Sequence, residues 1–302
     1  MLPYINGDKK IIKRYKGTQL VYQLQSDFDL GFEFSGNSLT FKLNGVNNYT
    51  ATTSPYKTMI SNLGIETLTS TYQMFRNCSG LTKILSIPDT SNVVRMESMF
   101  TNCSGLTSLD VSSMVIDKTT TIDYIFSGCM NLTEIKGLEN WNTSNLDTLN
   151  YIFPNCRNLT SLNIGGWNVN KVTYLTSVFQ NCSGLTSLDL SSWRFDELRF
   201  VSNVFQNCSS LETLDLSGWD VSNAQSPTYL FDGCSNLKTL NVSGWNTSNF
   251  DTPDSITRNF RGCTSLNRLI LGNCSQETYN WWFNSLAVEE LEGQVTIEYT
   301  IV

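Results

Sequence analysis

VFQNCSGLTSLDLSSW, residues 178–193, is the stretch that decides the fold, because its key residues recur along the chain at fixed offsets. Each of eight copies has a phenylalanine three residues before a cysteine and a leucine three residues after it. A repeat period of about 20 to 50 residues is typical of solenoids and propellers. The chain is therefore predicted to be a tandem-repeat protein. The eight cysteines, 25 to 29 residues apart, are Cys78, Cys103, Cys129, Cys156, Cys182, Cys208, Cys234 and Cys263.

Each repeat is predicted to form one coil of a solenoid, and positions are counted here from its cysteine as position 0. Apolar residues at +3, +6 and +8, such as Leu185, Leu188 and Leu190, predict a strand at the +6/+8 alternation. A tryptophan at +11 or +12 closes the following corner in five repeats. Beyond it the apolar spacing changes to 3 and 4, as in residues 198–205, which predicts a short helix. Residues 144–147, Ser-Asn-Leu-Asp, have the pattern of a capping box before such a helix.

Three segments are distinguished along the 302 residues. Residues 1–50 lack the repeat and are predicted to form a β-hairpin anchoring module, because tight-turn signals such as Asn6-Gly7 separate their apolar runs. Residues 51–275 are predicted to form the solenoid, with a degenerate first coil over 57–68. Residues 276–302 are predicted to form a C-terminal cap.

The predicted cap consists of a helix followed by an edge strand. Tyr279, Trp282, Phe283 and Leu286 follow the i, i+3, i+4, i+7 spacing of one helix face. Trp281 lies off that stripe, which predicts that it is exposed and contacts a neighbouring subunit.

Two stretches resemble a known repeat family. The frame C-x-x-L-x-x-L-x-L-x-x-W has the spacing of the leucine-rich repeat, with tryptophan in the place of the usual asparagine. Residues 99–113, MFTNCSGLTSLDVSS, and the stretch 178–193 resemble the BspA-like, 26-residue repeat of bacterial surface proteins, over about residues 57–275. The resemblance implies an exported adhesion protein without catalytic residues. It also implies an α/β fold, a right-handed leucine-rich-repeat solenoid of about nine coils, each with a strand and a short helix.

The N-terminal residues show a second resemblance. Tyr4-Ile5-Asn6-Gly7 and residues 14–23, RYKGTQLVYQ, are similar to the opening of many virion proteins of phages that infect gut Bacteroidales. This resemblance implies assembly into a virion in the bacterial cytoplasm, which is consistent with reduced thiols and with a start that lacks the apolar stretch of a signal peptide.

The charge is unevenly distributed. The net charge of −7 combines +4 in residues 1–25 with −11 in the remainder, so the repeat array is acidic and nucleic-acid binding by it is not expected. The basic segment either anchors the chain to an acidic partner or is a solvated strand face. Its residues are Lys9, Lys10, Lys13, Arg14 and Lys16.

Catalytic and metal-binding roles are not expected. The chain has no histidine, which removes the most common general base and the most common metal ligand. No C-x-x-C pair is present, and one cysteine per coil does not supply a tetrahedral zinc site. The cysteines are predicted to be buried free thiols. No apolar run reaches the roughly 18 residues of a membrane span. The sequence therefore predicts neither an enzyme nor a cofactor.

The predicted binding surface is the outward side of the strand, at positions +5 and +7. Short hydroxyl and amide or carboxylate side chains repeat there, which suits hydrogen bonding to sugar hydroxyls or a peptide backbone. The alternative is that a solvated sheet face simply needs polar residues, and the absence of an aromatic residue among these positions weighs against a glycan. The residues are Ser108, Asp110, Ser161, Asn163, Ser187, Asp189, Thr213, Asp215, Thr239 and Asn241.

These observations predict a non-enzymatic recognition protein, a phage tail or capsid-decoration component for host or surface attachment. Its expected partners are other virion proteins at the N-terminal module and a bacterial surface protein or glycan at the solenoid, with homo-oligomers left open. The alternatives are a purely structural virion protein and a bacterial cell-surface adhesin.

Overall fold

The computed structural model describes the repeat array and its C-terminal end almost completely. It describes residues 12–16, 19–23, 30–35, 38–43, 46–52 and 70–302, except 80, 82, 83, 85, 86, 88, 89, 226, 251–257 and 292.

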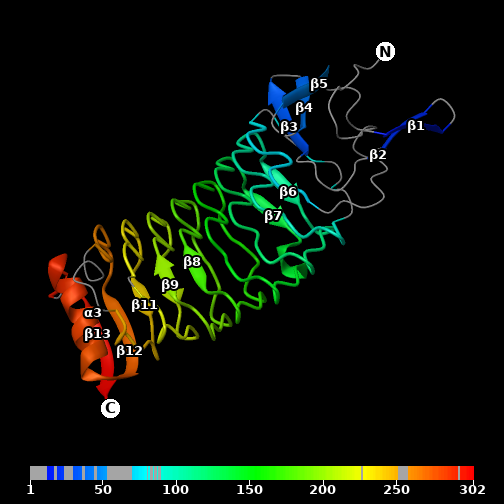
Figure 1. Cartoon of the computed structure of the whole chain (residues 1–302). Coiled ribbons are helices and arrows are strands. Elements are labelled where there is room, and N and C mark those ends of the chain that lie inside the picture. Colours follow the sequence, from blue (N-terminus) through cyan, green and yellow to red (C-terminus); the bar gives the residue numbers. More distant parts are fainter. Residues whose placement is uncertain are drawn as a thin grey trace.

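The described part of the chain folds as a parallel β-solenoid of about seven full turns, which join the eight repeats. In Figure 1 the coils stack along one axis, and the C-terminal helix and strands close one end of the row. The predicted solenoid is confirmed. The expected number of nine coils is not confirmed, because the degenerate coil expected over 57–68 lies outside the described residues.

A first parallel ladder lies where the sequence predicts a strand. Its outward residues occupy +5 and +7, and its inward residue occupies +6, in register from coil to coil. β6 (Ser108–Asp110) pairs with β7 (Glu134–Lys136), and β10 (Thr213–Asp215), β11 (Thr239–Asn241), β12 (Arg268–Cys274) and β13 (Thr296–Ile301) form a four-stranded parallel sheet.

A second parallel ladder lies where the sequence predicted short helices. β8 (Tyr174–Thr176) pairs with β9 (Phe200–Ser202), and position −8 continues as single bridges in other coils, for example between Thr121 and Thr148. The only helical turn in residues 90–225 is the 3₁₀ turn η1 (Leu138–Asn140). The helix prediction for these coils is therefore wrong.

Alternating backbone hydrogen bonds explain why this segment is not a helix. In residues 124–129, every second N–H donates to a carbonyl of the next coil: Tyr124 to Asn150, Phe126 to Ile152 and Gly128 to Pro154. The intervening N–H groups donate to the carbonyl three residues earlier. These three-residue turns place apolar side chains at spacings of 3 and 4, as a helix does, but leave half of the donors for stacking. Residues 144–147 do not form a capping box, because the Asn142 side chain accepts from the Ser144 N–H instead.

Each turn contains a residue in the left-handed region. At position −1 the φ angle is 59° to 76° in all eight coils, and the residue is always asparagine or glycine, the types that tolerate this conformation. The asparagines form an amide ladder: Asn181 donates to Asn155 over 2.9 Å, and Asn207 donates to Asn181 over 2.7 Å. At Gly128 a side chain would collide with the amide oxygen of Asn102 in the preceding coil.

The core is a set of identical side chains stacked along the axis. The eight phenylalanines at −3, from Phe75 to Phe260, form one continuous column with ring centroids 5.4 to 5.8 Å apart. The tryptophans from Trp141 to Trp245 form a second column at 6.0 to 6.3 Å. A single coil has no stacking partner, so stability depends on neighbouring coils.

The C-terminal end forms the predicted cap. α3 (Gln276–Val288) begins after Ser275, whose hydroxyl accepts from the Thr278 N–H, and β13 forms the edge of the sheet. The prediction for Trp281 is wrong: its side chain is buried, with its ring 5.0 Å from that of Phe250. Phe283, which was placed on the apolar stripe, is the more exposed residue.

In the N-terminal segment the described residues form antiparallel pairs. β1 (Ile12–Lys16) pairs with β2 (Gln19–Gln23), and β3 (Leu30–Ser35), β4 (Ser38–Leu43) and β5 (Val46–Thr52) form a three-stranded sheet. Its role as an anchoring module stays a prediction.

The asparagine ladder gives a test of the fold. Replacing Asn181 with alanine is expected to destabilise the protein by about 1–3 kcal/mol. Alanine is strained in the left-handed region, and the two side-chain hydrogen bonds of Asn181 are lost. Asn181→Gly loses the same bonds but keeps the backbone conformation, so its loss should be smaller. Equilibrium urea unfolding followed by tryptophan fluorescence measures both, and equal losses for the two variants would contradict the proposed role of the backbone.

Candidate recognition faces

The first face consists of the outward residues at +5 and +7 of the first ladder. The structure places all ten predicted binding residues outward on this side: eight are exposed, and Thr239 and Asn241 are half-buried. They form two parallel columns rather than a hollow, so the predicted geometry of the face agrees with the structure. Whether the face binds anything stays a prediction.

Most of the acidic and amide groups of the first face already have a structural task. The Asp189 carboxylate accepts hydrogen bonds from the N–H and the hydroxyl of Ser191, over 3.1 and 2.7 Å. Asp110, Asp215 and Asn241 accept from the backbone N–H two residues later in the same way. The hydrogen bonds from Ser191 hold the pKa of the Asp189 carboxyl below its usual value. These side chains close the corner after the strand, a role that asparagine fills as well as aspartate.

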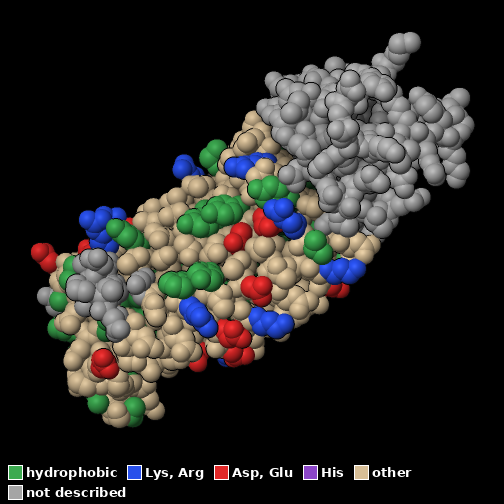
Figure 2. Space-filling model, in the orientation of Figure 1, with side chains coloured by type: hydrophobic (Ala, Val, Ile, Leu, Met, Phe, Trp, Pro, Cys, Tyr) green, Lys and Arg blue, Asp and Glu red, His purple; other side chains and the backbone are tan. Residues whose placement is uncertain are grey.

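The second face consists of the outward residues at −8, −6 and −5 around the second ladder. Four half-exposed aromatic side chains gather on it as two stacked pairs. The Tyr124 and Tyr151 rings at −5 have centroids 4.6 Å apart, and the Tyr174 and Phe200 rings at −8 have centroids 4.9 Å apart. Figure 2 shows elongated hydrophobic patches on the surface of the array, with few charged side chains between them.

Sequence reasoning missed this face, because a helix prediction gives no alternation of inward and outward residues. A signal was nevertheless available. Aromatic residues recur in neighbouring repeats at −5 and −8, positions at which most other repeats carry polar residues. They also fall outside the columns that form the core.

A strip of short polar side chains lies at −6, between the columns of the two aromatic pairs. Asp123 accepts from the Thr148 hydroxyl over 2.9 Å and from the Asn150 N–H over 2.8 Å, and the Asn150 side chain accepts from the Thr176 N–H. Burial raises the pKa of the Asp123 carboxyl above its usual value, although these hydrogen bonds act in the opposite direction. The strip continues with Ser202.

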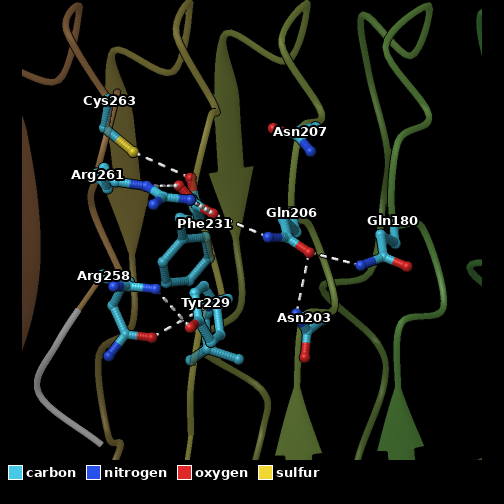
Figure 3. Close-up of polar contacts among 12 residues, drawn as sticks. Gln180, Asn203, Gln206, Asn207, Tyr229, Phe231, Arg258, Arg261 and Cys263 are labelled. Carbon is cyan, nitrogen blue, oxygen red and sulfur yellow. Dashed lines mark hydrogen bonds and ion pairs between the residues drawn. The ribbon is translucent and has the colours of Figure 1, made fainter. Parts of the chain in front are cut away.

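A polar network continues toward the C-terminal end of the array, as Figure 3 shows. The Arg261 guanidinium donates to both carboxylate oxygens of the buried Asp232, over 2.8 and 2.7 Å. Asp232 also accepts from Gln206, whose side-chain oxygen accepts in turn from Gln180. Between the same two coils, Arg258 donates to the Tyr229 hydroxyl over 3.0 Å. Each of these side chains is held by a neighbour, so the network is a structural feature that ties coils together.

The cysteines are structural donors. The Cys182 thiol donates to the Phe153 carbonyl of the preceding coil over 3.1 Å, and the same bond recurs from Cys103 to Cys263. All nine cysteines are buried and free. In the described residues no group of three or more histidine, cysteine, aspartate or glutamate side chains is placed to hold a metal ion.

The basic residues of the predicted anchoring segment lie near the N-terminus. Lys9 and Lys10 of the predicted anchoring segment lie outside the described residues, and the side chains of Lys13, Arg14 and Lys16 are not described either.

In the part of the chain that the structure describes, no helix has the length and apolar character needed to cross a membrane.

The parallel ladders, with each core position filled once per coil, define the protein as a parallel β-solenoid of tandem repeats. A family model described as "Mycoplasma protein of unknown function, DUF285" matches residues 44–161, 120–245 and 147–274. These overlapping matches cover more than half of the chain, which therefore belongs to this family. No curated protein and no solved structure matches the chain.

The buried thiols predict a loss of stability at alkaline pH. Burial raises the pKa of the Cys129, Cys182 and Cys263 thiols from 9.0 to about 12. The stabilisation is complete below the pKa of the unfolded thiol and is lost as the pH rises toward the folded value, because only the unfolded chain releases these protons. The urea midpoint should therefore fall steadily as the pH rises from about 9 toward 12, the interval between these two pKa values.

A matched variant isolates the thiol contribution. Cys182→Ser keeps a donor to the Phe153 carbonyl but does not ionise in this range, so its midpoint should fall less steeply than that of the wild type. Parallel pH profiles for the two proteins would contradict the assignment.

Proposed function

We propose that the protein is a non-enzymatic recognition protein whose solenoid presents outward side chains for attachment to a cell surface. The observation that supports this proposal most directly is that inward and outward residues of each coil have different roles. The inward positions are fixed by the phenylalanine, cysteine and tryptophan columns, whereas most of the outward side chains, including those of the first face, are accessible to solvent. Side chains held on a regular stack of coils are preorganised, which lowers the entropic cost of binding.

The finer parts of the proposal rest on the sequence. The relation to the leucine-rich-repeat class and to BspA-like adhesins rests on the repeat pattern of residues 57–275, and the place of the chain in a phage virion rests on the N-terminal residues. In this setting the N-terminal module anchors the chain to other virion proteins, and the solenoid contacts the host surface.

One observation favours a second candidate, a purely structural virion protein. Asp110, Asp189, Asp215 and Asn241 of the first face are used to close corners of their own coils. A face whose polar groups serve the fold needs no ligand to explain it.

Cell binding separates the two candidates. The fluorescently labelled full chain is titrated onto intact gut bacteria and measured by flow cytometry. Saturable binding is expected for a recognition protein, and binding to none of the bacteria would favour the structural role.

A pair of variants then tests the first face without disturbing its corners. Ser187→Lys with Thr213→Lys places bulk and charge at +5, next to the turn-forming residues but not among them. Asp189→Asn with Asp215→Asn removes charge and keeps the turns, as Asn241 does in its own coil. If the first face carries the binding, the lysine variant should lose about tenfold or more in affinity while its urea midpoint stays near that of the wild type.

A further inference from the structure

The second face carries aromatic rings that the core does not need. Tyr124, Tyr174 and Phe200 are 41%, 42% and 39% exposed, although each coil already supplies a buried phenylalanine at −3. Each ring is stacked on an aromatic ring of an adjacent coil and keeps part of its surface exposed on the outside of the array. Exposed apolar groups gathered on one side of a protein mark interaction sites.

The backbone under the two tyrosines makes their presence costly. Tyr124 and Tyr151 have φ angles of 62° and 54°, in the left-handed region that bulky side chains rarely adopt. The coil imposes this conformation at −5 in all eight repeats; asparagine tolerates it better, as at Asn203, and the bulky Tyr229 at the same position is held by Arg258. Side chains kept in an unfavourable backbone conformation point to a functional requirement.

The rings are arranged so that some of their flat faces stay open. In the −5 column the pair of Tyr124 and Tyr151 lies between the small, buried Ser98 and Ser177. In the −8 column the coil before Tyr174 carries the short Thr148. The outer faces of Tyr124, Tyr151 and Tyr174 are therefore bordered by a short side chain rather than by another ring, whereas Phe200 adjoins Gln225.

The polar strip at −6 lies between the two columns. Asp123, Asn150, Thr176 and Ser202 are half-buried and place carboxylate, amide and hydroxyl groups beside the rings, although Asp123 and Asn150 also bond to neighbouring coils. Four coils, spaced about 4.8 Å apart, give a platform about 14 Å long from the first ring to the last. This length fits an extended chain of several units better than a single small molecule.

The charge of the face selects the class of ligand. Asp123 is the only charged residue among the outward −8, −6 and −5 positions of these four coils. Nucleic acids need lysine or arginine for their phosphates, and none is present at these positions. The apolar area is split into two ring pairs separated by polar groups, unlike the continuous apolar centre of a protein interface. Open aromatic faces beside neutral hydrogen-bonding groups fit the C–H faces and hydroxyl groups of sugar rings.

We infer that the second face binds an extended, uncharged polysaccharide, with Tyr124, Tyr151, Tyr174 and Phe200 as the stacking residues and Asp123, Asn150 and Thr176 beside them. This inference deepens the proposed recognition function and rests on it, and it gives that function a location and a ligand class. The stacking residues act through contact, without any chemical step.

The test uses a variant built from residues that neighbouring coils already carry. Tyr124 and Tyr151 become asparagine, as at Asn203, and Tyr174 and Phe200 become threonine, as at Thr121 and Thr148. The matched control is Tyr229→Asn, which removes a tyrosine at −5 whose hydroxyl is held by Arg258 outside the platform. The quadruple variant should have a urea midpoint equal to or above that of the wild type, since the strain at two positions is relieved. A large fall would instead show that the rings serve the fold.

Binding is measured with the full chain in two arms. In the first, intact gut bacteria are treated with periodate, which cleaves sugar diols, or with proteinase K, before flow cytometry. Binding should be lost after periodate, kept after proteinase K, reduced about tenfold or more in the quadruple variant and unchanged in Tyr229→Asn. Binding that survives periodate and is lost after proteinase K would overturn the polysaccharide inference and leave the attachment function standing.

In the second arm, purified neutral polysaccharides from bacterial capsules, lipopolysaccharide O-chains and plant β-glucans are immobilised and probed by biolayer interferometry. Binding by the wild type and by Tyr229→Asn, but not by the quadruple variant, supports the inference even if intact cells are not bound, a result that would count against the attachment function alone. Equal binding by the wild type and the quadruple variant, or no binding to any of the purified polysaccharides, would overturn the inference.

Discussion

The structure depends on the phenylalanine carbonyl at −3, where one coil is joined to the next. This oxygen accepts the N–H of the cysteine in its own coil and the thiol of the cysteine in the next, as Phe126 does for Cys129 and Cys156. This carbonyl oxygen is buried. Without the cysteine N–H or the thiol as a donor, it would lose a hydrogen bond in an apolar interior, which is costly. Cysteine suits the position because it is small, apolar and still able to donate a hydrogen bond. The repeat of cysteine therefore reflects the geometry of stacking and not reactivity.

The stacking constraint separates the residues of a coil into two classes. Inward residues sit on columns in which every coil must match its neighbours, so phenylalanine, cysteine and tryptophan recur with little change. Outward residues face solvent and need only tolerate the backbone beneath them. Function in such an array is expected where an outward residue departs from what the backbone prefers, since no packing requirement explains the departure.

The two outward faces differ in this respect. On the first face, aspartate and asparagine both recur at +7 because both can close the same corner, so their recurrence follows from the fold. On the second face, Tyr124 and Tyr151 occupy a left-handed position at which three other coils carry the smaller serine or asparagine, and at which the bulky Tyr229 is held by Arg258. The regular pattern thus points to structure, and the irregular one points to binding. The first face has the longest periodic run of polar residues, so sequence periodicity alone favours it over the second face.

The sequence by itself determined the repeat, the stacking of coils, the buried columns and the strand at +5 to +7, because these follow from fixed spacing of apolar residues. It also located the C-terminal helix from its i, i+3, i+4, i+7 stripe, although Trp281 was placed on the wrong side of it. Only the tertiary structure decided the conformation between the corner and the phenylalanine. Three-residue turns and a helix give the same apolar spacing, and the difference lies in whether N–H groups bond within the coil or to the next one. Since that choice depends on the neighbouring coil, no local pattern reveals it, and the second face that it creates became visible only when the coils were stacked.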